Sequence, residues 1–282
     1  MRHLIASSRR AGQIAGRRWI EARDLAVKYV RQGRPLVAIV GRAGCGKTHI
    51  MLSMYEELKD YVRSFIDTTT LENRTLSTIA GAVASTQLII NLIKYAKCSR
   101  SKDYCKRLRE VYSSGVHNLI EYARRWPTDF LRDLTRLSQS RGYKGLIIFI
   151  DEGAISSDDP QIPQYIRTLH AFRNICSQID GLHVVFSILP DVLEYIAKVD
   201  VPLMDIIRTG VVYLPDYVER DEIQELAKIY PSREDCLTKL LDNYEMLPPL
   251  TVRQVLCLLQ ECDNPTICGI EESLEVRVEE QQ

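Results

Sequence analysis

The sequence predicts an α/β fold in which a five-stranded parallel sheet is flanked by helices and followed by a C-terminal helical lid subdomain. Three observations predict it. Five short apolar segments recur with helical patterns between them. A glycine-rich turn follows the first apolar segment, and the last 60 or so residues show helical patterns without a strand. With 45% hydrophobic and 26% charged residues, the 282-residue chain is neither disordered nor collagen-like.

The apolar and helical patterns predict where each strand and helix lies along the chain. The apolar strands are residues 35–40, 62–67, 146–150, 183–188 and 210–214. The helices are residues 17–32, 49–61, 164–179, 192–198, 219–229, 234–243 and 251–261. We therefore divide the chain into a basic helical segment 1–34, an α/β core 35–215 with a basic helical insertion at about 70–142, a lid 216–262 and a loosely ordered acidic tail 263–282.

A phosphate-binding motif follows the first strand. Residues 41–48 match G-x-x-x-x-G-K-[ST] at every fixed position, through Gly41, Arg42, Ala43, Gly44, Cys45, Gly46, Lys47 and Thr48. Glycines allow successive amides to point at one spot, and the following helix adds its positive N-terminal potential. The motif predicts that Lys47 reaches the β and γ phosphates of ATP and that Thr48 coordinates Mg²⁺; the neighbouring His49 is included in the nucleotide-binding set.

Two carboxylates, Asp151 and Glu152, end the third apolar strand. Ligands of open α/β sheets bind at the carboxyl ends of the strands, so this pair is expected at the nucleotide site. Asp151 is predicted to hold the Mg²⁺ shell and Glu152 to polarise the attacking water. Alone, the pair is equally typical of a strand that ends in solvent; its pairing with residues 41–48 makes it a strong signal.

Together these motifs resemble AAA+ ATPases, in particular the origin-recognition/Cdc6-like, TniB-like transposition and STAND-type archaeal group. The resemblance covers roughly residues 17–262 and implies three further site residues. Ser187 would sense the γ-phosphate, Arg208 would reach the nucleotide of a neighbouring subunit, and Arg253 would be a second sensor at the start of a lid helix. Each has a plainer alternative: a strand-end serine bonded to backbone, a surface ion pair with Asp205, or a solvated helix arginine.

The family pattern is incomplete at two places. Leu250-Thr251-Val252 replaces the usual Gly-Asn-Pro before Arg253, although Thr251 is a suitable N-cap. Only about 20 residues follow Glu261, too few for the winged-helix domain that origin-recognition relatives carry. If DNA is bound, we expect basic residues of 1–34 and 91–144 to bind it by phosphate contacts.

The net charge of zero hides an asymmetry. Residues 1–150 carry 27 Lys/Arg and 12 Asp/Glu, so 27 − 12 = +15, whereas residues 151–282 carry 10 and 25, so 10 − 25 = −15. Opposite charges of this size favour either a polyanion partner for the basic half or head-to-tail self-association into a homo-oligomer. The plain alternative is a dipolar but inert surface.

The uncharged stretch Thr75–Ile93 raises the question of a membrane span. Its polar side chains, which include Ser77, Thr78, Ser85, Thr86, Gln87 and Asn91, oppose insertion, so we expect one buried or interface helix and no membrane partner. Arginines interrupt any apolar start, so no secretory signal is expected and the protein is expected to be cytoplasmic.

Cysteine spacing gives weak signals. The eight cysteines contain no C-x-x-C pair, and reduced cytosolic thiols are the default, although some thermophilic cytosols tolerate disulfides. Cys98 and Cys105 have a spacing that allows a pair across a turn, while Cys257, Cys262 and Cys268 favour core positions over a metal site. Cys45, if exposed beside Lys47, would be prone to oxidation.

The sequence therefore predicts an AAA+-type ATPase that uses ATP and Mg²⁺ for assembly or remodelling on DNA, in replication, transposition, or mobile-element or viral DNA handling. A STAND-type switch with little hydrolysis and a non-catalytic DNA-associated structural protein remain alternatives.

Overall fold

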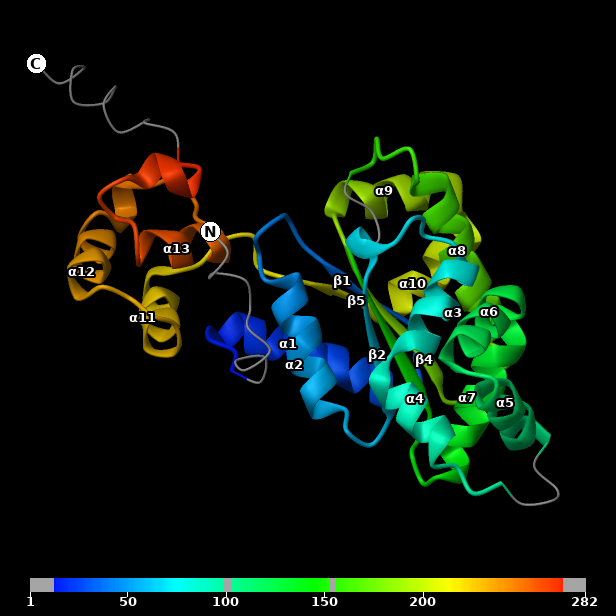
Figure 1. Cartoon of the computed structure of the whole chain (residues 1–282). Helices are drawn as coiled ribbons and strands as arrows, with labels where there is room; N and C mark the ends of the chain where they lie inside the picture. The colour runs from blue at the N-terminus through cyan, green and yellow to red at the C-terminus, as the bar shows by residue number, and fades with distance from the viewer. Residues whose placement is uncertain (1–12, 99–102, 153–155, 271–282) are drawn as a thin grey trace, which may run out of the picture. The chain divides into compact units, whose positions relative to one another are not determined.

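The computed structural model describes residues 13–98, 103–152 and 156–270 and contains the predicted parallel sheet (Figure 1). The strands are β1 (Leu36–Val40), β2 (Val62–Asp67), β3 (Leu146–Asp151), β4 (Leu182–Ile188) and β5 (Val211–Tyr213), in the order β2-β3-β4-β1-β5. The pairs β1–β4, β2–β3 and β3–β4 are parallel. The α/β class and the five predicted strands are confirmed.

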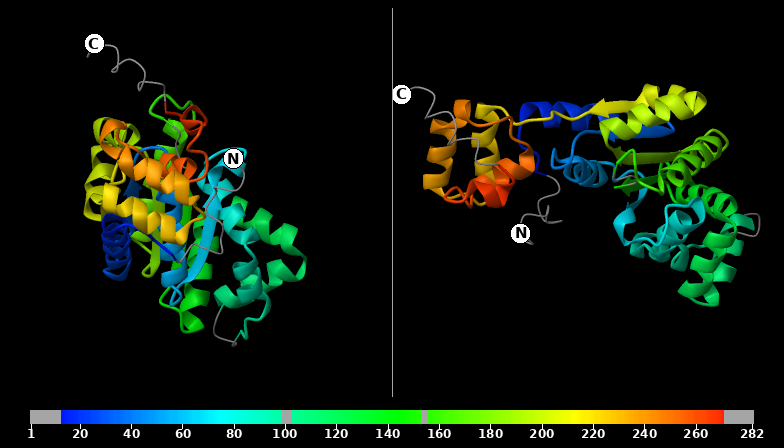
Figure 2. Two further views of the ribbon diagram at one scale, coloured as in Figure 1. Left: turned by 90° about the vertical axis from the view of Figure 1, so that its left-hand side faces the viewer. Right: turned by 90° about the horizontal axis from the view of Figure 1, so that it is seen from above.

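Helices connect and cover these strands. They are α1 (Arg17–Arg31), α2 (Lys47–Glu57), α3 (Leu76–Ser85), α4 (Gln87–Lys94), α5 (Asp103–Ser113), α6 (Val116–Arg125), α7 (Pro127–Ser140), α8 (Ile162–Cys176), α9 (Pro190–Val199), α10 (Val201–Ile207), α11 (Arg220–Ile229), α12 (Glu234–Asp242) and α13 (Val252–Leu258). The helices α3 to α7 gather beside the sheet in the cyan-to-green part of the chain (Figure 2).

The chain divides into two compact units. One contains residues 25–40 and 54–212, and therefore nearly the whole sheet with α3 to α10. The other contains residues 1–24, 41–53 and 213–282, and therefore the glycine-rich loop together with α11, α12 and α13. Residues 1–12 of the predicted basic segment and 271–282 of the predicted tail lie outside the described residues.

Strand register decides which side chains enter the core of the larger unit. Leu36, Ala38 and Val40 of β1 pair with Val184, Phe186 and Ile188 of β4, and all six pack against α3 to α10. The opposite face holds Phe149, on which Tyr55 of α2 packs edge-on at 5.7 Å between ring centroids. Because successive residues alternate between faces, every second residue at the strand ends turns away from that core.

The uncharged stretch is not one helix, contrary to expectation. It forms α3 and α4, which meet at 67°. Thr86 lies between them in an extended conformation, and its hydroxyl bonds Ser64 Oγ at 2.8 Å instead of continuing the helix. Among the described residues, only this bent pair passes a length-and-composition test for a membrane span, and no single helix does.

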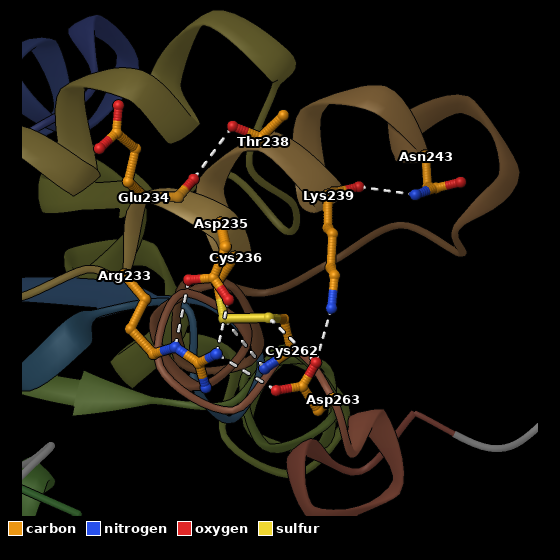
Figure 3. The surroundings of a disulfide bond; sticks show 9 residues. All are labelled: Arg233, Glu234, Asp235, Cys236, Thr238, Lys239, Asn243, Cys262 and Asp263. Atoms are coloured by element: carbon orange, nitrogen blue, oxygen red, sulfur yellow. Dashed lines mark hydrogen bonds and ion pairs between the residues drawn. A yellow bond between two sulfur atoms is a disulfide. The ribbon is translucent and has the colours of Figure 1, made fainter.

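Six of the eight cysteines are paired, so the expectation of reduced thiols is wrong for them. The pairs are Cys98–Cys105, Cys236–Cys262 and Cys257–Cys268, while Cys45 and Cys176 are free and buried. The predicted loose tail is wrong for residues 263–270, where a short 3-10 helix, Pro265–Cys268, is tied to α13 by its disulfide. Figure 3 shows Cys236–Cys262 beside Arg233, which bridges Asp235 and Asp263.

We predict that replacing both Cys236 and Cys262 by Ser lowers the free energy of unfolding by about 3 kcal/mol, because the bond closes a loop of 26 residues in the unfolded chain. Chemical denaturation of the oxidised protein measures this. Alkylation of unreduced, denatured protein followed by mass spectrometry should label two thiols; eight labelled thiols would contradict the pairing.

Candidate functional site

The glycine-rich loop between β1 and α2 is built around close backbone approaches. Gly44 and Gly46 have φ values of 82° and 99°, which favour glycine. A Cβ atom on Gly41 would lie 2.5 Å from Cys45 Sγ, and one on Gly44 would lie 3.0 Å from Arg253 Cβ. The conformation therefore favours glycine at all three positions, of which Gly41 and Gly46 are fixed in the motif.

Lys47 folds back over this loop. Its ammonium group donates hydrogen bonds to the carbonyl oxygens of Gly41 at 2.7 Å and Arg42 at 2.9 Å. Arg42, exposed beside it, lies 3.7 Å from Asp216. The lysine charge is thus held over the loop whose motif predicts a phosphate.

Cys45 is buried, so the exposure that would make its thiol prone to oxidation is not present. Burial raises the pKa of its thiol, which keeps it protonated at neutral pH. The backbone carbonyl of Cys45 accepts a hydrogen bond of 2.8 Å from the indole Nε1 of Trp19. Trp19 therefore supports the loop from α1, a role that the apolar pattern of the sequence did not reveal.

Helix α13 contacts the same loop. The Arg253 amide donates to the Gly44 carbonyl at 3.0 Å, and the Thr251 hydroxyl caps α13 by accepting from the Gln254 amide. The capping box formed by Thr251 and Gln254 fixes the helix start against the loop. Arg253 therefore lies beside the glycine-rich loop through its backbone, and its side chain is exposed.

His49, the first residue after the motif, is enclosed by neighbouring polar groups. Its Nε2 lies 2.7 Å from the Gln13 carbonyl and 3.3 Å from the Tyr230 hydroxyl. Burial lowers the pKa of His49, so the neutral ring is favoured at pH 7. Nearby, the Arg18 guanidinium binds the buried carboxylate of Glu222 at 2.5 Å and fastens the first turn of α1 to α11.

The acidic pair ends β3 in the larger unit. Strand register puts Asp151 beside Ser187 of β4, and Ser187 Oγ donates to Asp151 Oδ1 at 2.6 Å. Asp151 is 5% exposed, so this hydrogen bond compensates part of the cost of burying its charge. Ser187 is therefore bonded to a carboxylate side chain and not only to backbone.

Glu152 has an unusual backbone conformation. Its φ of 55° is the only positive value at a non-glycine residue in the described part of the chain. Its amide donates to Ser187 Oγ at 2.9 Å, and its carbonyl accepts from the Thr68 hydroxyl at 2.6 Å. The same Thr68 hydroxyl lies 2.9 Å from the Asp151 carbonyl. Ser187 at the end of β4 and Thr68 just after β2 thus hold Glu152 in a backbone conformation that costs on the order of 1 kcal/mol.

Arg208 lies apart from these groups, at the end of α10. It is about two-thirds exposed and lies 3.6 Å from Asp205, which is the surface ion pair given above as its plainer alternative. Its exposure leaves it accessible to another molecule.

Comparisons with solved structures identify the fold. The Orc1 protein of Aeropyrum pernix, solved in complex with DNA, matches 92% of this chain with a TM-score of 0.55 at 15% identity. A Walker-type ATPase of Pyrococcus abyssi matches 95% of it with the same TM-score and identity. This chain has the same fold as these two proteins.

The resemblance to these two proteins is one of structure. The chain spans 62% of the length of the Aeropyrum protein and 73% of the Pyrococcus protein. No protein-family model and no curated protein matches the sequence. The comparisons therefore identify the fold, while the site residues rest on the motifs and contacts described above.

We predict that Ser187→Ala destabilises the protein by about 1–3 kcal/mol, because it removes the donor to buried Asp151 and the acceptor for the Glu152 amide. Urea denaturation measures the change. Ser53→Ala is the matched control, since Ser53 is as deeply buried and its hydroxyl has no hydrogen-bond partner within the described structure. Equal effects of the two substitutions would contradict the role of Ser187.

Proposed function

We propose that this protein is an ATPase that binds ATP with Mg²⁺ and uses its hydrolysis for assembly or remodelling on DNA. The observation that carries the proposal is the conformation of residues 41–48, where glycine is required by close contacts and Lys47 lies over the loop. The acidic pair at the end of β3 supports hydrolysis beyond simple binding.

Phosphate binding would begin with the loop itself. In the proposed complex, amides of residues 44–48 and the N-terminus of α2 face the phosphates, and the Lys47 ammonium exchanges its bonds to Gly41 and Arg42 for phosphate oxygens. Arg253 would add positive charge from α13. His49 follows Thr48 directly and is held by its contact with the Gln13 carbonyl.

By the chemistry of their side chains, Thr48 and Asp151 would suit a magnesium ion. Thr48 offers a hydroxyl and Asp151 a carboxylate, both hard oxygen ligands. The Ser187 hydroxyl orients the Asp151 carboxylate through Oδ1. When bound, magnesium would neutralise charge on the phosphate oxygens.

Glu152 is the proposed general base. Polarising a water needs a carboxylate held in a constant direction, and the hydrogen bonds to Ser187 and Thr68 fix the backbone on both sides of the Glu152 Cα. In this proposal Ser187 and Thr68 are positioning residues. Exposed Arg208 would stabilise charge on the phosphates of a neighbouring copy in a homo-oligomer.

DNA is the proposed partner of the basic half. The +15 charge of residues 1–150 (27 − 12) would attract a polyanion, and the Aeropyrum protein of the same fold was solved with DNA. Basic residues of 1–34 and 91–144 would make the phosphate contacts.

Two substitutions test the ATPase. Lys47→Ala should abolish ATP binding, whereas Glu152→Gln should retain binding and lower kcat by about 100-fold or more. Isothermal titration with Mg-ATP and a phosphate-release assay separate the two effects. Hydrolysis by Glu152→Gln at the wild-type rate would refute the assignment of the base.

The role of DNA is tested by ATP turnover measured with and without duplex DNA, at several protein and salt concentrations. We expect stimulation that declines as salt rises, because phosphate contacts release counterions. ATP binding without turnover or stimulation would instead favour a STAND-type switch. A melting temperature that does not change on addition of Mg-ATP would favour a non-catalytic structural protein, since a ligand at 100 times its Kd stabilises the folded state by about 2.7 kcal/mol.

A further inference from the structure

Two exposed aromatic side chains stand out in the basic insertion. Tyr95, at the end of α4, is 63% exposed, and Trp126, between α6 and α7, is 51% exposed. Large aromatic surfaces are normally buried in a core or used for binding. Other apolar side chains of α4, α6 and α7 are buried in the hydrophobic core, whereas these two rings are exposed.

Each of these rings carries a cation on its face. Lys94 Nζ lies 5.3 Å from the centroid of the Tyr95 ring, and the Arg125 guanidinium lies 5.6 Å from that of Trp126. A ring with a flanking positive charge suits a nucleotide, because the base stacks on the ring and the phosphate meets the cation. An apolar protein partner would gain nothing from the cations.

Helix α7 connects the two rings. Trp126 occupies its N-cap position, and Arg141 at its C-terminus donates a 3.1 Å hydrogen bond to the Tyr95 carbonyl. The 14 residues of α7 span about 20 Å. That length corresponds to about six nucleotides at a stacked spacing of ~3.4 Å.

The face of α7 between the rings is basic. Arg132 and Arg136 lie one turn apart, Arg136 is exposed, and Arg132 is partly exposed and paired with Asp129 at 2.7 Å. Arg124 and Arg141 are also exposed near the two ends. Residues 91–144 carry 13 Lys/Arg against 5 Asp/Glu, which favours a polyanionic occupant for this face.

We propose that this face, defined by Tyr95, Trp126 and the arginines of α7 and its ends, is a binding site for single-stranded nucleic acid. Bases stack on Tyr95 and Trp126, and the phosphates between them lie along Arg132 and Arg136. Rigid duplex DNA would offer the phosphates but keep its bases stacked on one another. The inference deepens the proposed nucleic-acid partner and is independent of ATP hydrolysis.

The test uses the full-length protein and fluorescence anisotropy with a labelled oligothymidylate of 20 nucleotides and a duplex of equal length. Trp126→Ala should weaken single-strand binding by roughly 5- to 100-fold and change duplex binding little. Trp126→Phe should retain binding, because a ring remains. Tyr213→Ala is the matched control, since Tyr213 is equally exposed on β5.

Two further measurements separate stacking from charge. Oligothymidylate should quench the tryptophan fluorescence of wild type but not that of Trp126→Phe, because the other tryptophan, Trp19, is buried. Arg136→Gln should reduce the slope of log affinity against log salt by about 0.7.

The failures are distinguishable. If Trp126→Ala binds the single strand as well as wild type does, or if duplex binding is equally impaired, the stacking site is refuted while a nucleic-acid partner stands. If wild type binds neither oligonucleotide, both the site and the proposed partner are refuted.

Discussion

The short hydrogen bond between Ser187 and Asp151 is the interaction on which the candidate catalytic edge depends. It exists because β3 and β4 pair in parallel with one particular register, and a shift of one residue in either strand would turn the polar side chain of that strand into the apolar core. The buried Asp151 charge then makes that register costly to change, because a slipped strand would leave the carboxylate without its donor. Packing on one face of the sheet and hydrogen bonding on the other therefore enforce the same alignment.

The backbone at Glu152 follows from this alignment. Ser187 accepts from its amide and Thr68 donates to its carbonyl, so the strained φ of 55° is held by residues at the ends of two flanking strands. Strain that is fixed from two sides points to a positioned functional group and argues against a loosely ended strand. The contacts thus distinguish Glu152 from the last residue of a strand that merely ends in solvent.

The sequence was sufficient for the α/β class, the strands and the loop motif, since apolar runs and fixed glycines are local signals. It was insufficient where tertiary contacts decide. Thr86 breaks an uncharged stretch because Ser64 of β2 offers it a partner, and no sequence pattern indicates that Trp19 Nε1 supports the loop. Thr68 gave no signal either, because a lone threonine after a strand is ordinary. The disulfides depend on distances between segments up to 26 residues apart, which spacing alone does not supply.

The disulfides also bear on how the smaller unit serves the loop. Helix α13 has only seven residues, too few to be stable alone. Its start is fixed by the Thr251 cap and the Arg253 amide at Gly44, and its last turn by Cys257–Cys268. Cys236–Cys262 then ties the segment after α13 to α12. A short helix restrained at both ends can present Arg253 to the loop in one orientation, which a longer but unrestrained helix would not guarantee. The covalent bonds thus substitute for helix length in positioning the arginine.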